Sequence, residues 1–322
     1  PELPEVETIA RELRPLVVGA VIGDVWFDWP RVVKHPAPES FREGLRGREI
    51  MDVTRRAKWL VIALSGDGVL ALQVKMTGQL FVVPAGTEHD RHVHLRFELV
   101  DGRWLLLRDM RKFARVGLYR RDDAGRVLGA DEADDLFAHH GPEPLDDAFT
   151  LRAFRQLLRR RKGRLKPLLL DQGFVAGVGN IYADEALWRA RLHPLRSAAS
   201  LRPDDERRLY HAVRSVLNEA IERRGSTIDD YLSLEGEGGM QHHLNVYQRT
   251  GLPCPRCDRP TRRIVLGARG THFCSWCQRL PAVQRSPQIR RLLAGTASLP
   301  ARRGRNWSEL PTGDGAVGAG GS

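Results

Sequence analysis

Four cysteines near the carboxyl end place the strongest constraint on how this chain folds. Cys254 and Cys257 form one Cys-x2-Cys pair, and Cys274 and Cys277 form a second pair after sixteen intervening residues. Two such pairs at this spacing are typical of a tetrahedral zinc site, with redox-active pairs or surface thiols as the alternative. Because four thiolates leave no open position for water, the pattern predicts one structural Zn²⁺.

The residues between the cysteine pairs predict a basic β-hairpin. They include Arg262, Arg263 and Arg269, and Arg269 lies next to the glycines of the expected tip. Such a hairpin either enters a nucleic-acid groove or forms a solvated basic turn. The whole chain has a formal net charge of +11 and a pI of about 10.1. This charge favours a nucleic-acid partner over a solubility charge or an anionic membrane surface.

The sequence before the cysteines divides into a β-rich part and a helical part. Apolar spacing predicts a first helix over residues 4–17. Short apolar runs then alternate with turn signals such as Asp101-Gly102, which predicts hairpins in a sandwich or barrel. Later segments have helical periodicity, most clearly residues 202–224. No apolar run is long enough to span a membrane, and the confined cysteines indicate a reducing, cytosolic location.

A glycine turn precedes one of the expected helices. Gly177 and Gly179 give Gly-x-Gly, but Tyr182 occupies the third glycine position of a dinucleotide fingerprint. The preceding segment is also helical rather than extended, so the dinucleotide interpretation fails. Asn180 is then expected at a helix N-terminus, where it serves either as a simple cap or as part of a phosphate site.

Seven motifs in order give the chain a family resemblance. They are "PELPEVET", "RRAK" at 55–58, "MTGQL" at 76–80, "RKF" at 111–113, "GPEPL", "LLLDQGFVAGVGNIYADE" and "VYQRTGLPCPRC". From Pro1 to about Arg279 the chain resembles the formamidopyrimidine-DNA glycosylases, within the wider group that includes endonuclease VIII.

The resemblance implies an α+β fold with DNA in a cleft between two domains. Residues 1–136 are expected to form a catalytic β-sandwich flanked by helices. The helix-two-turn-helix domain is expected over residues 137–244 and the zinc-finger hairpin over 245–280. Residues 281–322 are expected to be a basic, disordered tail, which either adds nonspecific DNA affinity or is inert.

The resemblance also implies a chemical role for the first residues. The free amine of Pro1 is expected to be the nucleophile, so that removal of a preceding methionine is functional, and Glu2 is expected to move protons. Lys58 and Arg269 are expected to act as proton donors or phosphate clamps. The implied enzyme is a bifunctional DNA glycosylase/AP lyase of base excision repair. It removes 8-oxoguanine and formamidopyrimidines through a Schiff base at Pro1, followed by β,δ-elimination.

Further residues match the family's DNA-binding positions. Met76, Arg111 and Phe113 are expected to fill the space left by an everted nucleotide, although a core or surface role is the ordinary alternative. Asn180 and Arg269 are expected to grip phosphates, and Lys162 and Lys166 to lie near DNA. His89 matches a DNA-contacting histidine, with His92 as a rival. The expected partner is damaged double-stranded DNA, bound by a monomer in the bacterial cytosol.

Two rival functions remain open. An endonuclease VIII-like glycosylase for oxidised pyrimidines is disfavoured because the chain begins "PELPE" rather than "PEGPE". A non-catalytic zinc DNA-binding protein is disfavoured by the presence of Pro1, Glu2 and Lys58 together. The segment "LSLEGEGGMQHHLNVY" is shorter than the family's lesion-capping region, which leaves the base specificity open.

Overall fold

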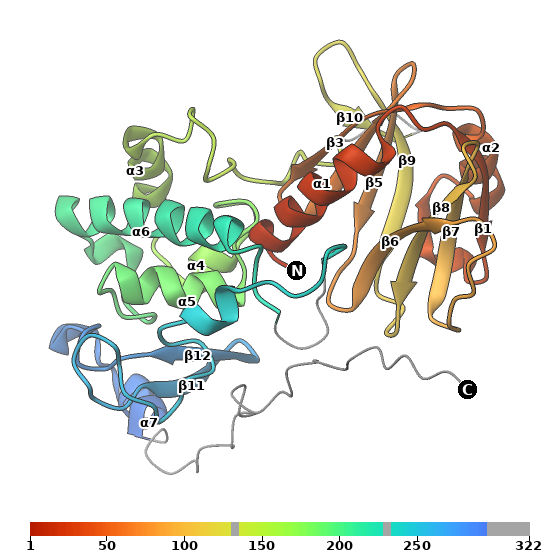
Figure 1. The fold of residues 1–322 in the computed structure, drawn as a ribbon. Coiled ribbons are helices and arrows are strands. Elements are labelled where there is room, and N and C mark those ends of the chain that lie inside the picture. The colour runs from red at the N-terminus through yellow and green to blue at the C-terminus, as the bar shows by residue number, and fades with distance from the viewer. Residues whose placement is uncertain (130–134, 228–232, 295–322) are drawn as a thin grey trace, which may run out of the picture.

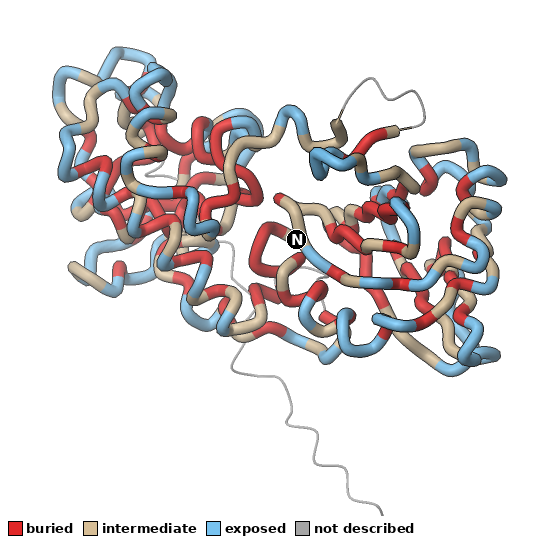
Figure 2. The backbone as a smooth tube through the Cα atoms, turned by 90° about the horizontal axis from the view of Figure 1, so that it is seen from above, coloured by how far each residue is buried: buried red, intermediate tan, exposed pale blue. Residues whose placement is uncertain are grey.

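The computed structural model describes residues 1–129, 135–227 and 233–294. A β-sandwich occupies one end of the molecule, helices occupy the other, and a small β-hairpin lies below the helices (Figure 1). Buried residues gather inside each half, and the N-terminus lies where the two halves meet (Figure 2). None of the helices in the described ranges has the length and hydropathy to cross a bilayer.

Two antiparallel sheets form the sandwich, as the sequence predicted. The first has the order β1 (Ile22–Phe27), β7 (Val93–Leu99), β8 (Arg103–Asp109) and β6 (Gly78–Pro84). The second has the order β10 (Val127–Leu128), β9 (Arg115–Arg121), β5 (Gly68–Gln73), β4 (Trp59–Leu64) and β3 (Ile50–Arg56), with β2 (Val33–His35) parallel to β9. Asp101-Gly102 forms the turn between β7 and β8, with Gly102 at φ +85°.

The sandwich core continues into two helices. The helix α1 (Leu3–Val17) packs against β3, and α2 (Pro38–Leu45) packs against β1 and β2. Ile9, Phe41, Ile62 and Leu95 are buried in one apolar cluster that joins both sheets to these helices. The first helix begins one residue before its predicted start. Because its apolar face is buried in this core, the helix holds the amino terminus in place.

The second half is helical and has its own core. It contains α3 (Leu151–Arg159), α4 (Leu165–Leu170), α5 (Asn180–Arg189) and α6 (Pro203–Glu222), with single turns at η2 (Ala198–Ser200) and η3 (Met240–His243). The predicted apolar face of α6 is buried, including Leu209, Val216 and Leu217. The helix α5 packs between α6 and the hairpin and is buried over most of its length.

The cysteine pairs flank the predicted hairpin. Strand β11 (Arg262–Leu266) pairs with β12 (Arg269–Phe273), and Leu266 lies opposite Arg269. The two turn residues, Gly267 and Ala268, have φ values of +52° and +60°. Two residues with positive φ match the right-handed twist of the strands, so the turn is tight and Arg269 follows it directly.

The expectation of disorder from residue 281 was wrong for the residues up to 294. After a turn at η4 (Ala282–Gln284), Pro287–Ala294 forms the helix α7. Ile289 is buried against Ile264 and Phe273 of the hairpin and against Leu195. The apolar side of this short basic helix thus packs against the hairpin. The Arg, Pro and Gly content of the segment did not indicate this packing. Residues 295–322, the rest of the expected tail, lie outside the described residues.

This packing predicts that α7 stabilises the hairpin. Ile289→Ala should lower the free energy of unfolding by about 2 kcal/mol or more, because it leaves a cavity among buried apolar groups. The control Val283→Ala, at a side chain 92% exposed, should change it by less than about 0.5 kcal/mol. Urea unfolding of the zinc-loaded protein measures both values, and equal effects would show that α7 does not pack in solution.

Candidate active site

The amino terminus lies in a cavity between the two halves of the molecule. The cavity has a volume of about 480 Å³. Both halves contribute to its wall, which consists of Pro1, Glu2, Glu5, Lys58, Lys75, Met76, Leu170, Gln172, Gly179, Asn180, Ile181, Ser226, Tyr247 and Arg269. Six of the predicted site residues therefore meet in one place: Pro1, Glu2, Lys58, Met76, Asn180 and Arg269.

The glycine turn before α5 is shaped around the Glu2 carboxylate. The N–H of Gly179 donates to Glu2 Oε2 over 2.7 Å, and the N–H of Ile181 donates to Oε1 over 2.8 Å. A Cβ at position 179 would lie 2.3 Å from Glu2 Cδ, so only glycine leaves room for the carboxylate. The Gly-x-Gly motif thus binds the Glu2 carboxyl group at a helix N-terminus, where backbone N–H donors point out of the helix.

Asn180 is the first residue of α5, and Gly179 occupies the N-cap position. The side chain of Asn180 therefore does not cap the helix as one sequence interpretation required. Its Oδ1 atom is buried and has no hydrogen-bond partner among the described residues, while the residue lines the cavity. An amide oxygen cannot donate to a phosphate, so the phosphate alternative rests on the Nδ2 donor of this cavity-lining residue and stays a prediction.

Burial shifts the two terminal groups in opposite directions. It lowers the pKa of the Pro1 amine, although Glu5 and Glu2 act to raise it, and Lys58 and Lys75 lower it further. Burial also raises the pKa of Glu2, against the opposing effect of Lys58. Both shifts favour neutral forms, so the cavity presents an amine that can attack and a carboxyl group that can donate a proton.

Glu5 holds the carboxylate array together one helical turn later. Its Oε2 accepts the N–H of Glu2 over 2.8 Å, and its Oε1 accepts the hydroxyl of Tyr182 and the N–H of Ser226. Glu5 is only 2% exposed, so these partners replace the water it loses on folding. The carboxylate therefore joins α1, α5 and the segment after α6 beside Pro1.

Lys58 is presented by the tight turn between β3 and β4. The preceding residue, Ala57, has a φ of +54°, and its N–H donates to Glu143 Oε1 over 2.6 Å. A non-glycine residue in this region is strained, so the buried Glu143 carboxylate helps to hold the turn in place. Burial lowers the pKa of Lys58, and Glu2 acts to raise it. The ammonium can therefore serve as an acid closer to neutral pH than an exposed lysine.

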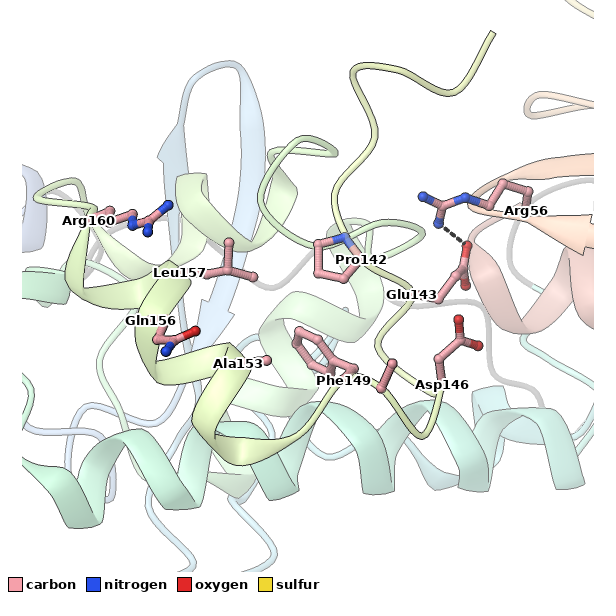
Figure 3. A pocket seen from close by; sticks show the side chains of 10 residues that line it. Arg56, Pro142, Glu143, Asp146, Phe149, Ala153, Gln156, Leu157 and Arg160 are labelled. Atoms are coloured by element: carbon pink, nitrogen blue, oxygen red, sulfur yellow. Dashed lines mark hydrogen bonds and ion pairs between the residues drawn. The ribbon is translucent and has the colours of Figure 1, made fainter. Parts of the chain in front are cut away.

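A second, larger cavity has no comparable chemistry. It has a volume of about 590 Å³ and lies near the connection between the halves, with Arg56 and Glu143 at one side and α3 at the other (Figure 3). Glu143 is bound by Arg55 and Arg56 at 2.7 Å each. Burial acts to raise the pKa of Glu143, but Arg55, the Ala57 N–H and Arg56 hold it below its ordinary value. The carboxylate is thus a structural anion.

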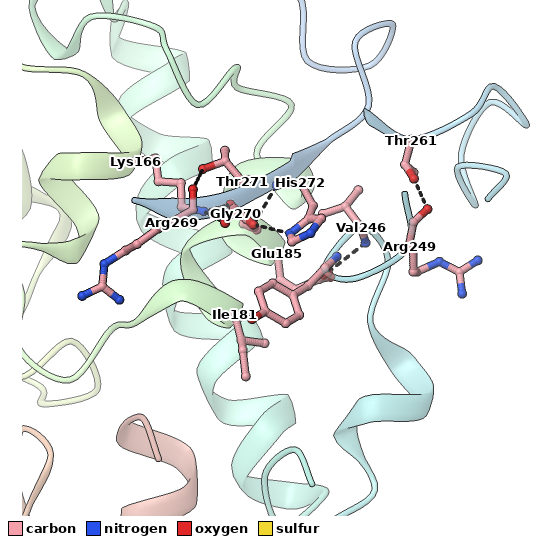
Figure 4. A network of polar contacts seen from close by, with 12 residues as sticks. Lys166, Ile181, Glu185, Val246, Arg249, Thr261, Arg269, Gly270, Thr271 and His272 are labelled. Atoms are coloured by element: carbon pink, nitrogen blue, oxygen red, sulfur yellow. Dashed lines mark hydrogen bonds and ion pairs between the residues drawn. The ribbon is translucent and has the colours of Figure 1, made fainter. Parts of the chain in front are cut away.

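A buried ion pair positions the hairpin that carries Arg269. Lys166 Nζ lies 2.6 Å from Asp184 Oδ1 and donates to the carbonyl of Gly270 over 2.9 Å. Asp184 also accepts the N–H of His272 over 2.8 Å. Arg269 projects away from this network (Figure 4) and reaches the cavity wall. With a side chain 1% exposed, Lys166 supports the hairpin from behind and does not face the cavity that was expected to hold DNA.

Glu185 connects the same helix to the cavity. Its carboxylate accepts the N–H groups of Asn245, Val246 and Tyr247, at distances from 2.9 to 3.0 Å (Figure 4). Burial raises its pKa, and these hydrogen bonds act to lower it. Because Tyr247 lines the cavity, Glu185 fixes part of the wall from within the helical core.

The residues expected to fill an emptied stack form one exposed cluster. Arg111 Cζ lies 4.7 Å from the Phe113 ring centroid, and Arg111 Nη1 lies 3.8 Å from Met76 Sδ. Met76 is 53% exposed and Phe113 is 48% exposed. The two side chains come from different turns, before β6 and before β9. Large side chains left this exposed are available for a partner.

One buried carboxylate, Asp109, joins the two turns that carry this cluster. Its Oδ2 accepts the N–H groups of Phe113 and Ala114, each over 2.7 Å. Its Oδ1 accepts the N–H of Arg111 over 3.2 Å and the hydroxyl of Thr77, the residue after Met76. At 2% exposure, Asp109 depends on these donors and fixes both turns relative to each other.

Besides Lys166, Arg111 and Phe113, three further predicted residues lie away from the cavity wall. His89 is exposed, with its ring 5.9 Å from that of Trp26. The N–H of His92 donates to Asp90 Oδ1 over 2.9 Å. Lys162 is exposed in the segment between α3 and α4. Their contacts with DNA, and the choice between His89 and His92, stay predictions.

The four cysteines fit a zinc ion. Their sulfur atoms all lie within 4.8 Å of one another. Cys257 and Cys274 are separated by 3.5 Å and Cys254 and Cys277 by 4.0 Å, close to the ~3.8 Å expected for thiolates 2.3 Å from one tetrahedral zinc. Trp188 Nε1 donates to Cys254 Sγ over 3.3 Å, which orients that ligand. These residues hold one structural Zn²⁺ and link the hairpin to α5.

A two-domain fold with a buried terminal amine, a basic hairpin and a zinc site defines a class of DNA-processing proteins, and comparison with known proteins identifies the family. The formamidopyrimidine-DNA glycosylase N-terminal domain matches residues 1–116, and its H2TH domain matches residues 140–231. The zinc finger found in FPG and IleRS matches residues 251–280.

Curated relatives and solved structures agree with these domain matches. The formamidopyrimidine-DNA glycosylases of Roseiflexus sp. and Chloroflexus aurantiacus are each 47% identical to this chain, over 87% and 86% of it and over 100% and 97% of their own lengths. The crystal structure of the MutM (Fpg) protein from Thermus thermophilus covers 86% of this chain and 98% of its own, with 44% identity and a TM-score of 0.76.

A further structure, of Lactococcus lactis Fpg with an abasic site containing DNA, is 34% identical with a TM-score of 0.79 and covers 87% of this chain and all of its own. The chain belongs to the formamidopyrimidine-DNA glycosylase family and is a DNA glycosylase of base excision repair.

Several residues that organise the site escaped the sequence reasoning. They are the buried acids Glu5, Asp109, Glu143, Asp184 and Glu185. Each lies within one of the seven motifs or within two residues of one. A usable signal was present for two of them, because the adjacent acids in "IYADEALW" lie on a helix surrounded by apolar residues. Acids in such a setting are buried and need partners.

We expect Asp109→Asn to uncouple the two exposed turns. An amide cannot accept all the backbone donors, and losing hydrogen bonds to a buried charge costs roughly 1.5–3 kcal/mol, or about tenfold to a hundredfold in rate. Base excision should slow by that factor, while binding to abasic-site DNA should weaken less, because no stacked base must be everted there. Asp101→Asn, at an exposed turn of the same sheet, is the control. Equal losses on both substrates would contradict the assignment.

The direction in which Lys75 shifts the pKa of the Pro1 amine can be tested. Lys75 lowers that pKa, so Lys75→Gln should raise it. Because the reactive amine is unprotonated, the acid limb of the single-turnover rate should move to higher pH. The exposed Lys162→Gln is the control and should leave the limb in place. A shift of the Lys75→Gln profile to lower pH would exclude Pro1 as the titrating group.

Proposed function

We propose that this enzyme is a bifunctional glycosylase and lyase that removes oxidised purines from double-stranded DNA. The observation that carries the proposal is the Pro1 amine, buried with a lowered pKa in a cavity between Glu2, Glu5 and Lys58. The proposal requires a mature protein in which Pro1 bears a free amine. The names and titles of the relatives support formamidopyrimidine and related lesions as substrates.

Excision begins with attack of the Pro1 nitrogen on C1′ of the damaged nucleotide. The bond between C1′ and the base breaks, its electron pair leaves with the base, and the amine gives up its proton. Glu2 is placed to donate a proton to the sugar ring oxygen, so that the ring opens and an iminium forms at C1′. The raised pKa of Glu2 supports this role, because it increases the protonated fraction.

The iminium then allows two eliminations. Loss of a C2′ proton breaks the bond between C3′ and its oxygen, and loss of a C4′ proton breaks the bond between C5′ and its oxygen. Both phosphates leave as anions. Lys58 and Arg269 line the cavity as cations and are suited to hold these phosphates or to protonate the leaving oxygens. The product is a one-nucleotide gap with phosphate at both ends.

DNA contact follows the cations and exposed apolar groups that border the cavity. Asn180 and Arg269 are suited to phosphates, and Met76, Arg111 and Phe113 to the space left by the everted nucleotide. Zinc acts only by ordering the hairpin that carries Arg269. We also propose that the protein acts as a monomer in the bacterial cytoplasm, since one chain supplies every group used above.

The proposal is tested on a duplex that contains 8-oxoguanine. Wild type should be trapped on this DNA by borohydride, and a gel that resolves end groups should show phosphate on both sides of the gap without added magnesium. An extra alanine before Pro1 should abolish both results, because an amide nitrogen is not a nucleophile, whereas an alanine after Ser322 should not.

Other outcomes separate the alternatives. Excision of oxidised pyrimidines in preference to 8-oxoguanine would favour the endonuclease VIII-like alternative. Binding without trapping would favour the non-catalytic alternative. Arg269→Ala should slow the second cut more than the first, and an unchanged ratio would remove Arg269 from the elimination step.

A further inference from the structure

A separate cavity lies beside the catalytic one on the sandwich domain. It has a volume of about 350 Å³. Its wall consists of Trp29, Lys34, Lys75, Met76, Lys112, Phe113, Ala114 and Arg115. Trp29 precedes η1 (Pro30–Val32), Lys34 lies in β2, and Arg115 is the first residue of β9. The other residues come from the turns that precede β6 and β9. Nothing in the mechanism above uses this cavity as a whole.

The charge of the cavity wall is entirely positive. Lys34, Lys75, Lys112 and Arg115 line it, and no aspartate or glutamate does. Within the described ranges, none of these four cations has a carboxylate oxygen within ion-pair distance. The acid nearest to them in sequence, Asp109, is engaged by Thr77 and by the N–H groups of Phe113 and Ala114, and Asp28, which precedes Trp29, is engaged by His94 Nδ1 at 2.8 Å. Four cations without counter-ions repel one another, and an anionic ligand would relieve that cost.

Two aromatic rings give the cavity shape. Lys112 Nζ lies 5.7 Å from the ring centroid of Trp29, and Lys112 has a φ of +56°. That backbone conformation lets Lys112 contact Trp29 while its neighbours Arg111 and Phe113 contact each other. Lys112 is therefore held by a cation–π contact at a fixed place on the wall.

The two cavities share part of their wall. Lys75 and Met76 line both of them, whereas Pro1 and Lys58 line only the catalytic cavity and Phe113 lines only the second. Met76 and Phe113 are the apolar groups suited to the space inside the duplex. A DNA backbone bound along the second cavity is thus separated from Pro1 by Met76 and Phe113, the groups suited to replace the everted nucleotide.

We propose that the second cavity binds the phosphodiester backbone of the undamaged strand, next to the base that loses its partner. The inference rests on the proposed function, because it takes the strand bound at Pro1 as the damaged one. Groups inserted into the duplex separate the strand at Pro1 from the other strand, and three of the unpaired cations, Lys34, Lys112 and Arg115, line only the second cavity. Binding there opposes displacement of the undamaged strand while Met76, Arg111 and Phe113 occupy the duplex.

The test is a thermodynamic cycle between protein charge and DNA charge. Lys34→Ala and Arg115→Ala are each measured for affinity to abasic-site duplexes in which neutral methylphosphonates replace phosphates. The replacements flank either the abasic site or the base opposite it. Arg121→Ala, at the other end of β9 and outside the cavity, is the charge-matched control.

We expect coupling only with the undamaged strand. On an all-phosphate duplex each cavity variant should weaken binding, and the slope of log Kd against log salt should fall by about 1 for each phosphate that the variant no longer neutralises. On a duplex with neutral linkages in the undamaged strand, variant and wild type should bind equally. Arg121→Ala should show no such coupling.

Two outcomes would overturn the proposal. Coupling only with the damaged strand would show that the cavity binds that strand. No coupling with either strand would show that the cavity binds no phosphate. Borohydride trapping of each variant on 8-oxoguanine duplex reports whether its catalytic cavity is intact. Wild type that excises and traps but shows no coupling removes this inference alone, whereas wild type that fails to trap removes the proposed function.

Discussion

The hydrogen bonds between the Glu2 carboxylate and the amino end of α5 are the contact on which the rest of the site depends. They join the first residues of the sandwich half to the central helix of the other half. The cost of burying this carboxylate is offset by backbone donors that a helix start would otherwise leave unpaired. The Pro1 amine is therefore placed by a link between domains, and the cavity exists only while both halves are folded and docked.

The helix α5 carries this constraint to the rest of the helical half. Asp184 binds Lys166 and the hairpin, Glu185 binds the segment that ends at Tyr247, and Trp188 binds a zinc ligand. Charged and aromatic groups on a buried helix are unfavourable unless each finds a partner, and here each partner belongs to a different segment. One helix thus sets the positions of the amine, the hairpin and the metal site.

The sequence predicted those features that depend on local pattern. The first helix, the hairpin turns, the α6 face and the cysteine cluster follow from spacing of apolar, turn and ligand residues within a few dozen positions. Glu143 could not be found in this way, because its partners lie on a turn that only tertiary packing brings to it. Asp109 has donors within five residues, but its link to Thr77 of another turn also depends on tertiary packing. The α7 helix was missed for a related reason, since its apolar stripe is short and its partner surface is the flank of the hairpin.

That flank gives the hairpin a second anchorage. The thiolates tie its base through a metal whose loss depends on chelators and oxidants, whereas Ile289 and its neighbours hold it by contacts that neither reagent attacks. Order in β11 and β12 therefore has two sources that respond to different chemical insults. The oxidants that damage DNA also reach the enzyme that repairs it. The hairpin that carries Arg269 stays packed on the helical domain through Leu195 and Phe273 even when the thiolates are oxidised.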